Sequence, residues 1–320
     1  PALPERAQDA GLVVLVLLGA MLVVQPVADR FAPRALARAV AWTASLWMGV
    51  AFFVLVLLVA SDAGALLLGA LLPPGAVVGA ARLRALGVVG VALLASTAGV
   101  RDALSGPALR RVELRLPRWP AALDGFRLVQ VSDLHIGPVL DRRFARDVVA
   151  RVNALAPDLV AITGDLVDGS TRRLAEEVAP FGALRAGHGV FFVTGNHDYY
   201  SGADAWVAVV RGLGIHVLRN EHVTIAAGAA VFDLAGVEDH HAHLVAPGWR
   251  EDVARALVGR DPARPVVLLA HDPATFPAAA RHGVDLQLSG HTHGGQVWPF
   301  AYLVRLATPF VAGLHRRGGS

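Results

Sequence analysis

Five short segments between residues 133 and 293 gather side chains of the kind that bind metal ions. They are Asp133-Leu134-His135, Gly164-Asp165-Leu166-Val167-Asp168, Gly195-Asn196-His197-Asp198, the single His271, and Gly290-His291-Thr292-His293. Carboxylate, amide and imidazole groups in this number can hold two hard or borderline divalent cations side by side. Such a pair can direct a metal-bound hydroxide at a phosphorus atom. These residue types therefore predict metal-assisted hydrolysis of a phosphate ester.

Each segment follows a short apolar run that is typical of a buried β-strand. We predict strands at 126–132, 158–163, 190–194, 266–270 and 286–289, and adjoining strands at 223–227 and 230–235. Helices are predicted at 142–154, 171–184, 203–213 and 249–258. This alternation predicts an α/β sheet. Because ligand-bearing loops converge at the carboxyl edge of such a sheet, we expect the five segments to meet there.

The series DLHIG, GDLVD, GNHDYY, AHDP and SGHTHGGQ resembles the calcineurin-like metallophosphoesterase superfamily over about residues 112–310. Within it, the chain is similar to a branch of membrane-associated bacterial phosphodiesterases. The resemblance implies a four-layer α/β/β/α sandwich and two bound metal ions. One ion would be bound by Asp133, His135 and His293, and the other by Asn196, His271 and His291. Asp165 would bridge both ions. Manganese is the metal we expect, although iron, zinc and nickel also accept this nitrogen and oxygen set.

The same resemblance implies that His197 is not a ligand but faces the substrate. It would protonate the leaving oxygen or stabilise the charged transition state. Asp198 is expected to orient His197 and to raise its basicity, and Asp168 is expected to contact a ligand from outside the metal shell. A glycine precedes three of the ligands and is expected to let the backbone turn sharply there: Gly164, Gly195 and Gly290.

Two further groups of residues have alternative interpretations. The run from Glu238 to His243 holds three histidines that could line the substrate mouth or bind a further metal ion, but a solvated loop is favoured. Trp298, Phe300 and Tyr302 follow the last segment closely. They are either ordinary core residues or an aromatic lip directed at lipid headgroups, where such side chains are enriched.

The first hundred residues differ from the rest, since they carry much of the 54% hydrophobic content while all 13 histidines lie at or beyond position 135. We predict a transmembrane region over 1–105 and a metallophosphoesterase domain over 106–320. Spans are predicted near 12–27, 39–60, 63–81 and 86–100, because these runs approach the ~20 residues that cross a bilayer. Related domains usually continue further than the 27 residues after His293. We therefore expect a shortened second sheet.

The charge distribution excludes a nucleic-acid-binding face. Residues 1–105 carry seven arginines against five acids and residues 106–320 carry 22 against 21, with no lysine and no concentrated basic stripe. The chain has no cysteine, which excludes disulfides and thiolate metal sites.

The positions of the arginines also indicate on which side of the membrane the catalytic domain lies. Arg30, Arg34 and Arg38 follow the first predicted span and Arg82 and Arg84 precede the fourth, while the turn predicted at Ser61-Asp62 has no positive charge. With four spans, the positive-inside rule favours an extracytoplasmic catalytic domain.

We therefore expect a multi-pass protein of the cell membrane that hydrolyses phosphodiester or pyrophosphate bonds by attack of metal-bound hydroxide. Monoesters are less favoured because the motifs contain no additional arginine clamp for a dianion. The membrane tether suggests a lipid-linked phosphorylated substrate. The alternative is a non-catalytic scaffold that keeps this fold to bind a partner, and the intact Asn196, His197 and His293 favour the enzyme. The sequence carries no signal for an oligomeric state.

Overall fold

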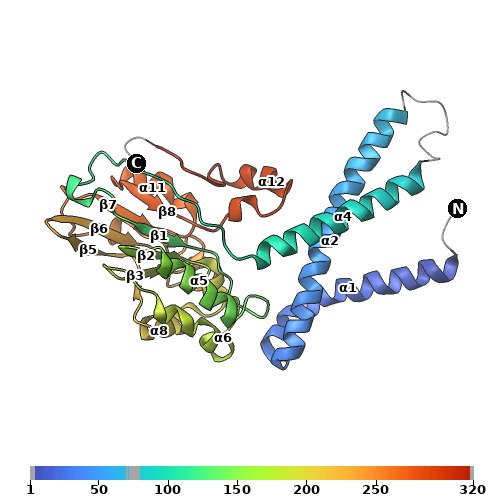
Figure 1. Cartoon of the computed structure of the whole chain (residues 1–320), viewed down its shortest axis with the longest axis horizontal. Helices are drawn as coiled ribbons and strands as arrows, with labels where there is room; N and C mark the ends of the chain where they lie inside the picture. Colours follow the sequence, from blue (N-terminus) through green and yellow to red (C-terminus); the bar gives the residue numbers. More distant parts are fainter. Residues whose placement is uncertain (1–3, 70, 72–79, 318–320) are drawn as a thin grey trace. The chain divides into compact units, whose positions relative to one another are not determined.

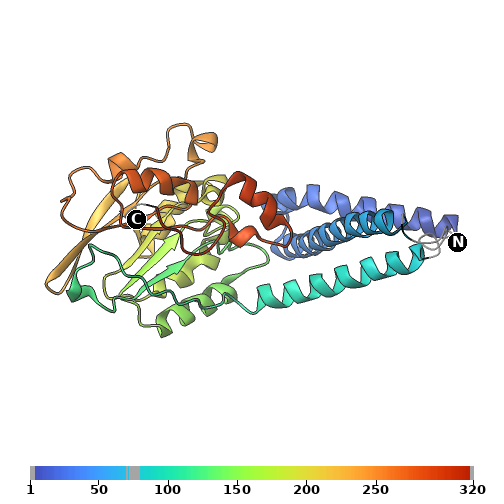
Figure 2. The ribbon, with the colours of Figure 1, turned by 90° about the horizontal axis from the view of Figure 1, so that it is seen from above.

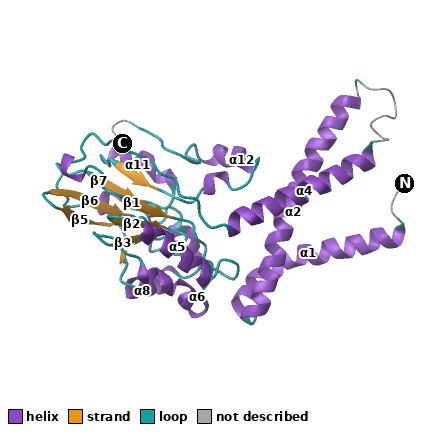
Figure 3. Ribbon diagram, viewed as in Figure 1, coloured by secondary structure: helices purple, strands orange, loops and turns teal. Residues whose placement is uncertain are grey.

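The computed structural model describes residues 4–69, 71 and 80–317. The chain divides into two compact units, one up to Leu109 and the other from Arg110 onward. Among the described residues, all strands belong to the second unit, while the first is helical (Figure 3).

The first unit contains three long helices: α1 (Glu5–Phe31), α2 (Arg34–Gly69) and α4 (Ala81–Leu104). All three are long and apolar enough to cross a membrane. Helix α2 packs against both α1 and α4. The buried residues at these contacts are small: Ala28, Ala37, Val40, Ala41, Ala44, Val88 and Ala92. Small residues allow close helix approach, which is how helices associate in membranes.

The four predicted spans are three helices among the described residues. The turn predicted at Ser61-Asp62 is wrong, because α2 runs through both residues without interruption. Asp62 instead forms an ion pair with Arg84 of α4 at 2.8 Å. The span predicted at 63–81 begins as the end of α2, and its residues 70 and 72–79 lie outside the described residues.

The second unit contains two four-stranded sheets. The first is parallel throughout and consists of β1 (Leu128–Val131), β2 (Leu159–Thr163), β3 (Val190–Val193) and β4 (His216–Val217). The second consists of β5 (Glu221–Ala227), β6 (Ala230–Gly236), β7 (Val266–Leu269) and β8 (Leu286–Leu288). Only β5 and β6 pair in antiparallel fashion, while β6, β7 and β8 are parallel.

The two sheets face each other across an apolar core. Because strand side chains alternate between faces, Leu159 and Ala161 of β2 pack with Phe232 and Leu234 of the second sheet. Val160 and Ile162 point the other way, toward the helices of the first sheet: α5 (Arg142–Ala154), α6 (Thr171–Val178) and α8 (Ala203–Gly212). Helices α10 (Val253–Ala256) and α11 (Phe276–Arg281) cover the outer face of the second sheet. The predicted four-layer α/β/β/α sandwich is confirmed (Figures 1 and 2).

Several elements are shorter than predicted. The helix predicted over 249–258 is reduced to α10, and the helix predicted over 171–184 ends at Val178, where Pro180 leads into a 3-10 turn. Other short elements lack a sequence pattern of their own: β4, α7 (Asn196–Tyr200), α9 (Ala242–Val245), α11 and α12 (Phe300–Ala307). These differences leave the order of strands and ligand-bearing loops unchanged.

Candidate metal centre

All five metal-binding segments lie just beyond the carboxyl ends of strands β1, β2, β3, β7 and β8. The loops after β1 and β2 run side by side, because the backbone N–H of Asp133 donates to Gly164 O at 3.1 Å. The N–H of His135 likewise donates to Asp165 O at 3.0 Å. The adjacent strands therefore bring their ligand-bearing loops to one edge, as the sequence predicts.

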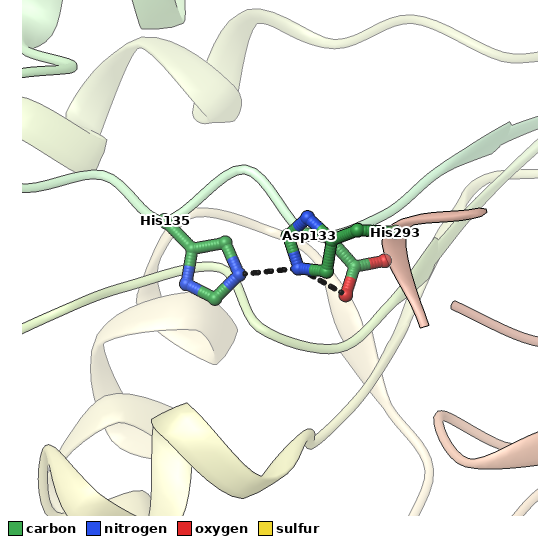
Figure 4. Close-up of side chains that lie close together, drawn as sticks. All are labelled: Asp133, His135 and His293. Atoms are coloured by element: carbon green, nitrogen blue, oxygen red, sulfur yellow. Dashed lines mark hydrogen bonds and ion pairs between the residues drawn. The ribbon is translucent and has the colours of Figure 1, made fainter. Parts of the chain in front are cut away.

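The first group of donor atoms comes from Asp133, His135 and His293 (Figure 4). Nε2 of His135 lies 3.1 Å from Nε2 of His293, and Nε2 of His293 lies 3.4 Å from Oδ1 of Asp133. Two imidazole nitrogens and a carboxylate oxygen that converge in this way suit a cation placed among them.

The second group consists of Asp165, His271 and His291. Nε2 of His271 lies 3.2 Å from Oδ2 of Asp165, and Nδ1 of His291 lies 3.3 Å from Nε2 of His271. Oδ1 of Asn196 adjoins the group, 2.9 Å from Nδ1 of His291. The same Asp165 oxygen is 3.8 Å from Nε2 of His135 in the first group. One carboxylate thus lies between the two groups.

Hydrogen bonds on the far side of two imidazoles hold their orientation. Nδ1 of His271 contacts the carbonyl oxygen of Thr163 at 2.7 Å, and Nδ1 of His135 contacts Oδ1 of Asp168 at 3.1 Å. Since a carbonyl or carboxylate can only accept, each Nδ1 carries a proton, which leaves Nε2 as the nitrogen that a metal ion would bind. This arrangement is typical of metal-ligating histidines. The residues present therefore fit a pair of divalent ions.

The backbone at the cluster adopts a conformation that L-residues rarely populate. Among the described residues, eight residues other than glycine have positive φ, and five of these are predicted ligands: Asp133 (56°), His135 (46°), Asp165 (51°), His291 (70°) and His293 (48°). Each such residue costs on the order of 1 kcal/mol or more. Strain concentrated on the donor residues indicates a functional constraint at this edge.

The three glycines before the ligands have different roles. Gly164 has a φ of +87°, and a Cβ there would lie 2.5 Å from Nδ1 of His271. Gly195 has an ordinary φ of −108°, yet a Cβ would lie 2.2 Å from Oδ1 of Asp165. At Gly290 a Cβ would lie 1.9 Å from Oγ of Ser132. The predicted sharp turn therefore explains Gly164 alone, while lack of space explains the other two.

His197 lies beside the first group with 41% of its side chain exposed. Its ring meets that of His135 edge to face, with centroids 4.5 Å apart. Nδ1 of His197 contacts Oδ1 of Asp168 at 2.6 Å, and this hydrogen bond raises the pKa of His197 above its ordinary value. Burial raises the pKa of Asp168, but its hydrogen bonds with His135 and His197 outweigh burial and hold that pKa well below its usual range.

The predicted pairing of Asp198 with His197 is wrong. Asp198 is fully buried and accepts three backbone N–H groups, from Asp165 (2.9 Å), Leu166 (3.0 Å) and Gly195 (2.8 Å). Burial, together with the nearby Asp165 carboxylate, raises the pKa of Asp198 to about 7 against these donors. Asp198 therefore ties the loop after β2 to the loop after β3, and Asp168 takes the place beside His197.

The sequence comparison agrees with this geometry. The model of the calcineurin-like phosphoesterase family matches residues 126–295, a range that includes every predicted ligand. The chain belongs to the calcineurin-like phosphoesterase family.

The relatives of this chain include proteins that are named as transmembrane proteins. The chain is 38% identical over 225 residues to a zebrafish (Danio rerio) transmembrane protein with metallophosphoesterase domain, covering 68% of this chain and 52% of that protein. It is 33% identical over 223 residues to an uncharacterized metallophosphoesterase of Helicobacter pylori strain J99, covering 69% and 58%. The chain spans little more than half the length of these curated relatives. The solved Haemophilus influenzae NAD nucleotidase is similar at a TM-score of 0.40 and 16% identity, covering 52% of this chain and 38% of that one.

One further carboxylate–imidazole contact at the site was not predicted from the sequence. Nδ1 of His241 lies 3.4 Å from Oδ2 of Asp272, and the His241 ring stacks on that of His291 with centroids 6.0 Å apart. His241 therefore lies beside the predicted ligand His291, while 41% of its side chain is exposed, as in a solvated loop. Asp272 directly follows the ligand His271, but no local pattern pairs it with His241, 31 positions earlier.

The acidic start of that same stretch, Glu238, contacts the segments that carry the predicted ligand Asn196. Glu238 is buried and accepts hydrogen bonds from Tyr199 (2.5 Å), Thr194 (3.0 Å) and Arg219 (2.5 Å). Burial and the Glu238 carboxylate raise the pKa of Tyr199 above its ordinary value. These contacts join β6 to helix α7, and α7 begins at Asn196.

Proposed function

We propose that this chain is a membrane-anchored phosphoesterase that hydrolyses phosphodiester or pyrophosphate bonds with the help of two divalent metal ions, manganese in the first instance. The observation that carries the proposal is the shared Asp165 oxygen, 3.2 Å from His271 and 3.8 Å from His135. Two-metal hydrolases need a ligand that joins both ions, and a carboxylate at the meeting point of two donor groups supplies it.

Each predicted ligand would then have a defined place. Asp133, His135 and His293 would hold one ion, Asn196, His271 and His291 the other, and Asp165 both. Once bound, the ions would supply Lewis-acid activation of water and neutralise charge on the phosphate oxygens. The carbonyl of Thr163 and the carboxylate of Asp168 would keep two of the imidazoles turned toward them.

His197 would assist departure of the leaving group. Its Nδ1 contacts Asp168, so Nε2 is the nitrogen free to donate a proton to the leaving oxygen. The raised pKa of His197 keeps a larger fraction protonated near neutral pH, which suits a general acid. Asp168 acts as a positioning residue for both His197 and the ligand His135.

The arginine contacts support a diester or pyrophosphate over a monoester. Arg219, close in the chain to the His-rich stretch, is paired with Glu238 and with Asp204 at 2.7 Å, and its guanidinium lies 3.7 Å from the centre of the Trp249 ring. Its charge is therefore already paired with two carboxylates. A lipid-linked substrate is supported by the three apolar helices of the same chain.

The helices also alter the expected membrane side. With α1, α2 and α4 each crossing the bilayer, the phosphoesterase unit emerges on the side of the α1–α2 loop. Arg30, Arg34 and Arg38 lie at that loop and Arg101 lies at the end of α4 on the same side, so they outnumber Arg6, Arg82 and Arg84 on the other side. The positive-inside rule therefore supports a cytoplasmic unit, opposite to the side favoured for four spans. A single cysteine at the exposed Val258 of this cysteine-free chain tests this. A membrane-impermeant maleimide should label it only after cells are permeabilised.

The catalytic proposal is tested with the full chain in nanodiscs, metal-stripped and reloaded with manganese. Hydrolysis of bis-p-nitrophenyl phosphate should exceed hydrolysis of p-nitrophenyl phosphate and should require the metal. Asn196→Ala and His197→Ala should each reduce the rate at least a hundredfold, whereas His282→Ala, at an exposed position, should leave it unchanged. A folded, metal-loaded protein without any phosphoesterase activity would favour the scaffold instead.

A further inference from the structure

Helix α12 exposes large apolar side chains close to the predicted ligand His293. The exposed fractions on and just before the helix are high: Trp298 68%, Tyr302 59%, Leu303 60% and Leu306 84%. The side chains that face the protein, Ala301 and Val304, are smaller and half-buried. The outer face of α12 therefore carries larger apolar side chains than its inner face, whereas an ordinary surface helix shows mainly polar side chains to the solvent.

The one charged residue of α12 is a cation, Arg305. Residues 294–320 contain three arginines (Arg305, Arg316 and Arg317) and no acidic residue. Arg305 is exposed on α12 itself, with its guanidinium 5.8 Å from the centre of the Tyr302 ring. The surface formed by Trp298 and α12, here called the α12 face, is thus both apolar and cationic.

The α12 face is attached firmly to the ligand-bearing loop. Gly295 lies so close to α12 that a Cβ at this position would be 2.4 Å from Cβ of Ala301. Beyond the helix, Oγ1 of Thr292 donates to the carbonyl oxygen of Val311 at 2.6 Å, and Phe310 packs edge to face on Phe276. Thr292 lies between the predicted ligands His291 and His293, so the position of the face is coupled to that of the metal-binding loop.

We propose that the α12 face docks on the anionic lipid surface of a bilayer. Contiguous exposed apolar patches mark interaction sites, and tryptophan, tyrosine and arginine around an apolar helix face are the composition of interfacial membrane helices. Phospholipid headgroups of negative charge complement Arg305. The bilayer is at hand, since the same chain carries three helices able to enter one.

Charge argues against a second copy of the chain as the occupant. A symmetric dimer through this face would bring Arg305 toward the same arginine of the partner, with no acid on α12 to pair with it. Docking does not depend on the proposed function. On that function, docking would bring a lipid-borne phosphate to the metal-binding edge.

The test uses the full chain, which has no native cysteine. Leu306→Cys is labelled with an environment-sensitive fluorophore and reconstituted into vesicles of phosphatidylglycerol and phosphatidylcholine that contain nitroxide-labelled lipid. Lipid quenching should be at least threefold stronger at position 306 than at the control Val258→Cys, which is 74% exposed on the same unit. Equal quenching at the two positions overturns the proposal. So does a probe at 306 that is shielded from iodide in water but not quenched by lipid, because a protein partner then covers the face.

A second variant separates docking from folding and from catalysis. Arg305→Glu should reduce the quenching at position 306 at least twofold in anionic vesicles and leave the hydrolysis of soluble bis-p-nitrophenyl phosphate unchanged. In vesicles of phosphatidylcholine alone, the quenching at position 306 should be at this reduced level whether position 305 is arginine or glutamate. Undiminished quenching with Arg305→Glu would contradict the role of charge, whether or not the protein is an active phosphoesterase.

Discussion

Asp168 contacts His197 at 2.6 Å through Oδ1 and Nδ1, and the same oxygen reaches Nδ1 of His135 at 3.1 Å. One carboxylate therefore orients both the proposed general acid and a proposed metal ligand. It comes from the loop after β2, three residues beyond the proposed bridging ligand Asp165.

Replacing Asp168 with asparagine should lower kcat by roughly 10- to 100-fold, the usual cost of losing a partner of a ligating histidine. The hydrogen bond with Asp168 is the largest cause of the raised pKa of His197. Without it, that pKa falls, and the alkaline limb of the rate profile should move to lower pH. The pH dependence of kcat measures this. Asp124→Asn, in an exposed loop, is the control, and an unshifted profile would exclude Asp168 as the partner of His197.

Metal removal should make the stability of the protein sensitive to alkaline pH. Burial lowers the pKa of His271, but Asp165 outweighs burial and raises it to about 10 in the metal-free protein. Because the pKa of His271 is higher in the folded state than its value near 6.5 in the unfolded chain, protonation of His271 stabilises the folded state fully below pH 6.5. This stabilisation disappears as the pH rises toward 10. It amounts to roughly a few kcal/mol.

The measurement is thermal unfolding of chelator-treated and manganese-loaded protein from pH 6 to pH 10. The midpoint of the metal-free protein should fall across this range, while the loaded protein should change less because the ion replaces the proton between His271 and Asp165. Parallel curves for the two forms would show that this pair does not bind the metal.

The ligand-bearing loops could be predicted because each motif directly follows a recognisable apolar strand. Asp165, for example, comes two residues after the fully buried β2. Periodicity identifies such a strand locally, and the geometry of a parallel sheet then brings the strand ends together. The four-layer arrangement, which brings the loops after β7 and β8 of the second sheet to those of the first, was implied by the family resemblance and not by periodicity.

The side-chain partners of those residues could not be predicted in the same way. Asp198 is adjacent to His197 in sequence, but within α7 its side chain turns back to cap the backbone N–H of Gly195. Asp168 reaches His197 from a different loop, 29 positions away. Similarly, Asp62 lies within α2 and forms an ion pair with Arg84 of another helix, 22 positions away. Contacts between distant segments leave no periodic signal.

Adding one methyl group at Gly290 should damage the metal centre. The Cβ of Gly290→Ala would lie 1.9 Å from Oγ of Ser132 and 2.2 Å from Oδ2 of Asp133, so the proposed ligand must move. Overpacking of this kind costs about 1–3 kcal/mol, and metal content should fall below one ion per chain. Gly212→Ala is the matched control, because a Cβ there meets nothing within 4 Å. Full metal content in Gly290→Ala would contradict this account of the glycine.

Removing the His241 ring should weaken metal binding in the second group specifically. The ring covers His291 and pairs with Asp272, whose Oδ2 also lies 3.8 Å from Nε2 of His291. His241→Ala leaves the proposed ligand His291 less constrained. The dissociation constant of the more weakly bound manganese ion should therefore rise about 10- to 100-fold. Calorimetric titration of the metal-stripped protein measures both affinities. His243→Ala provides the control. This histidine is exposed, and its ring forms a hydrogen bond with the carbonyl oxygen of His240 and not with a predicted ligand. Identical affinities in the two variants would mean that His241 merely borders the site.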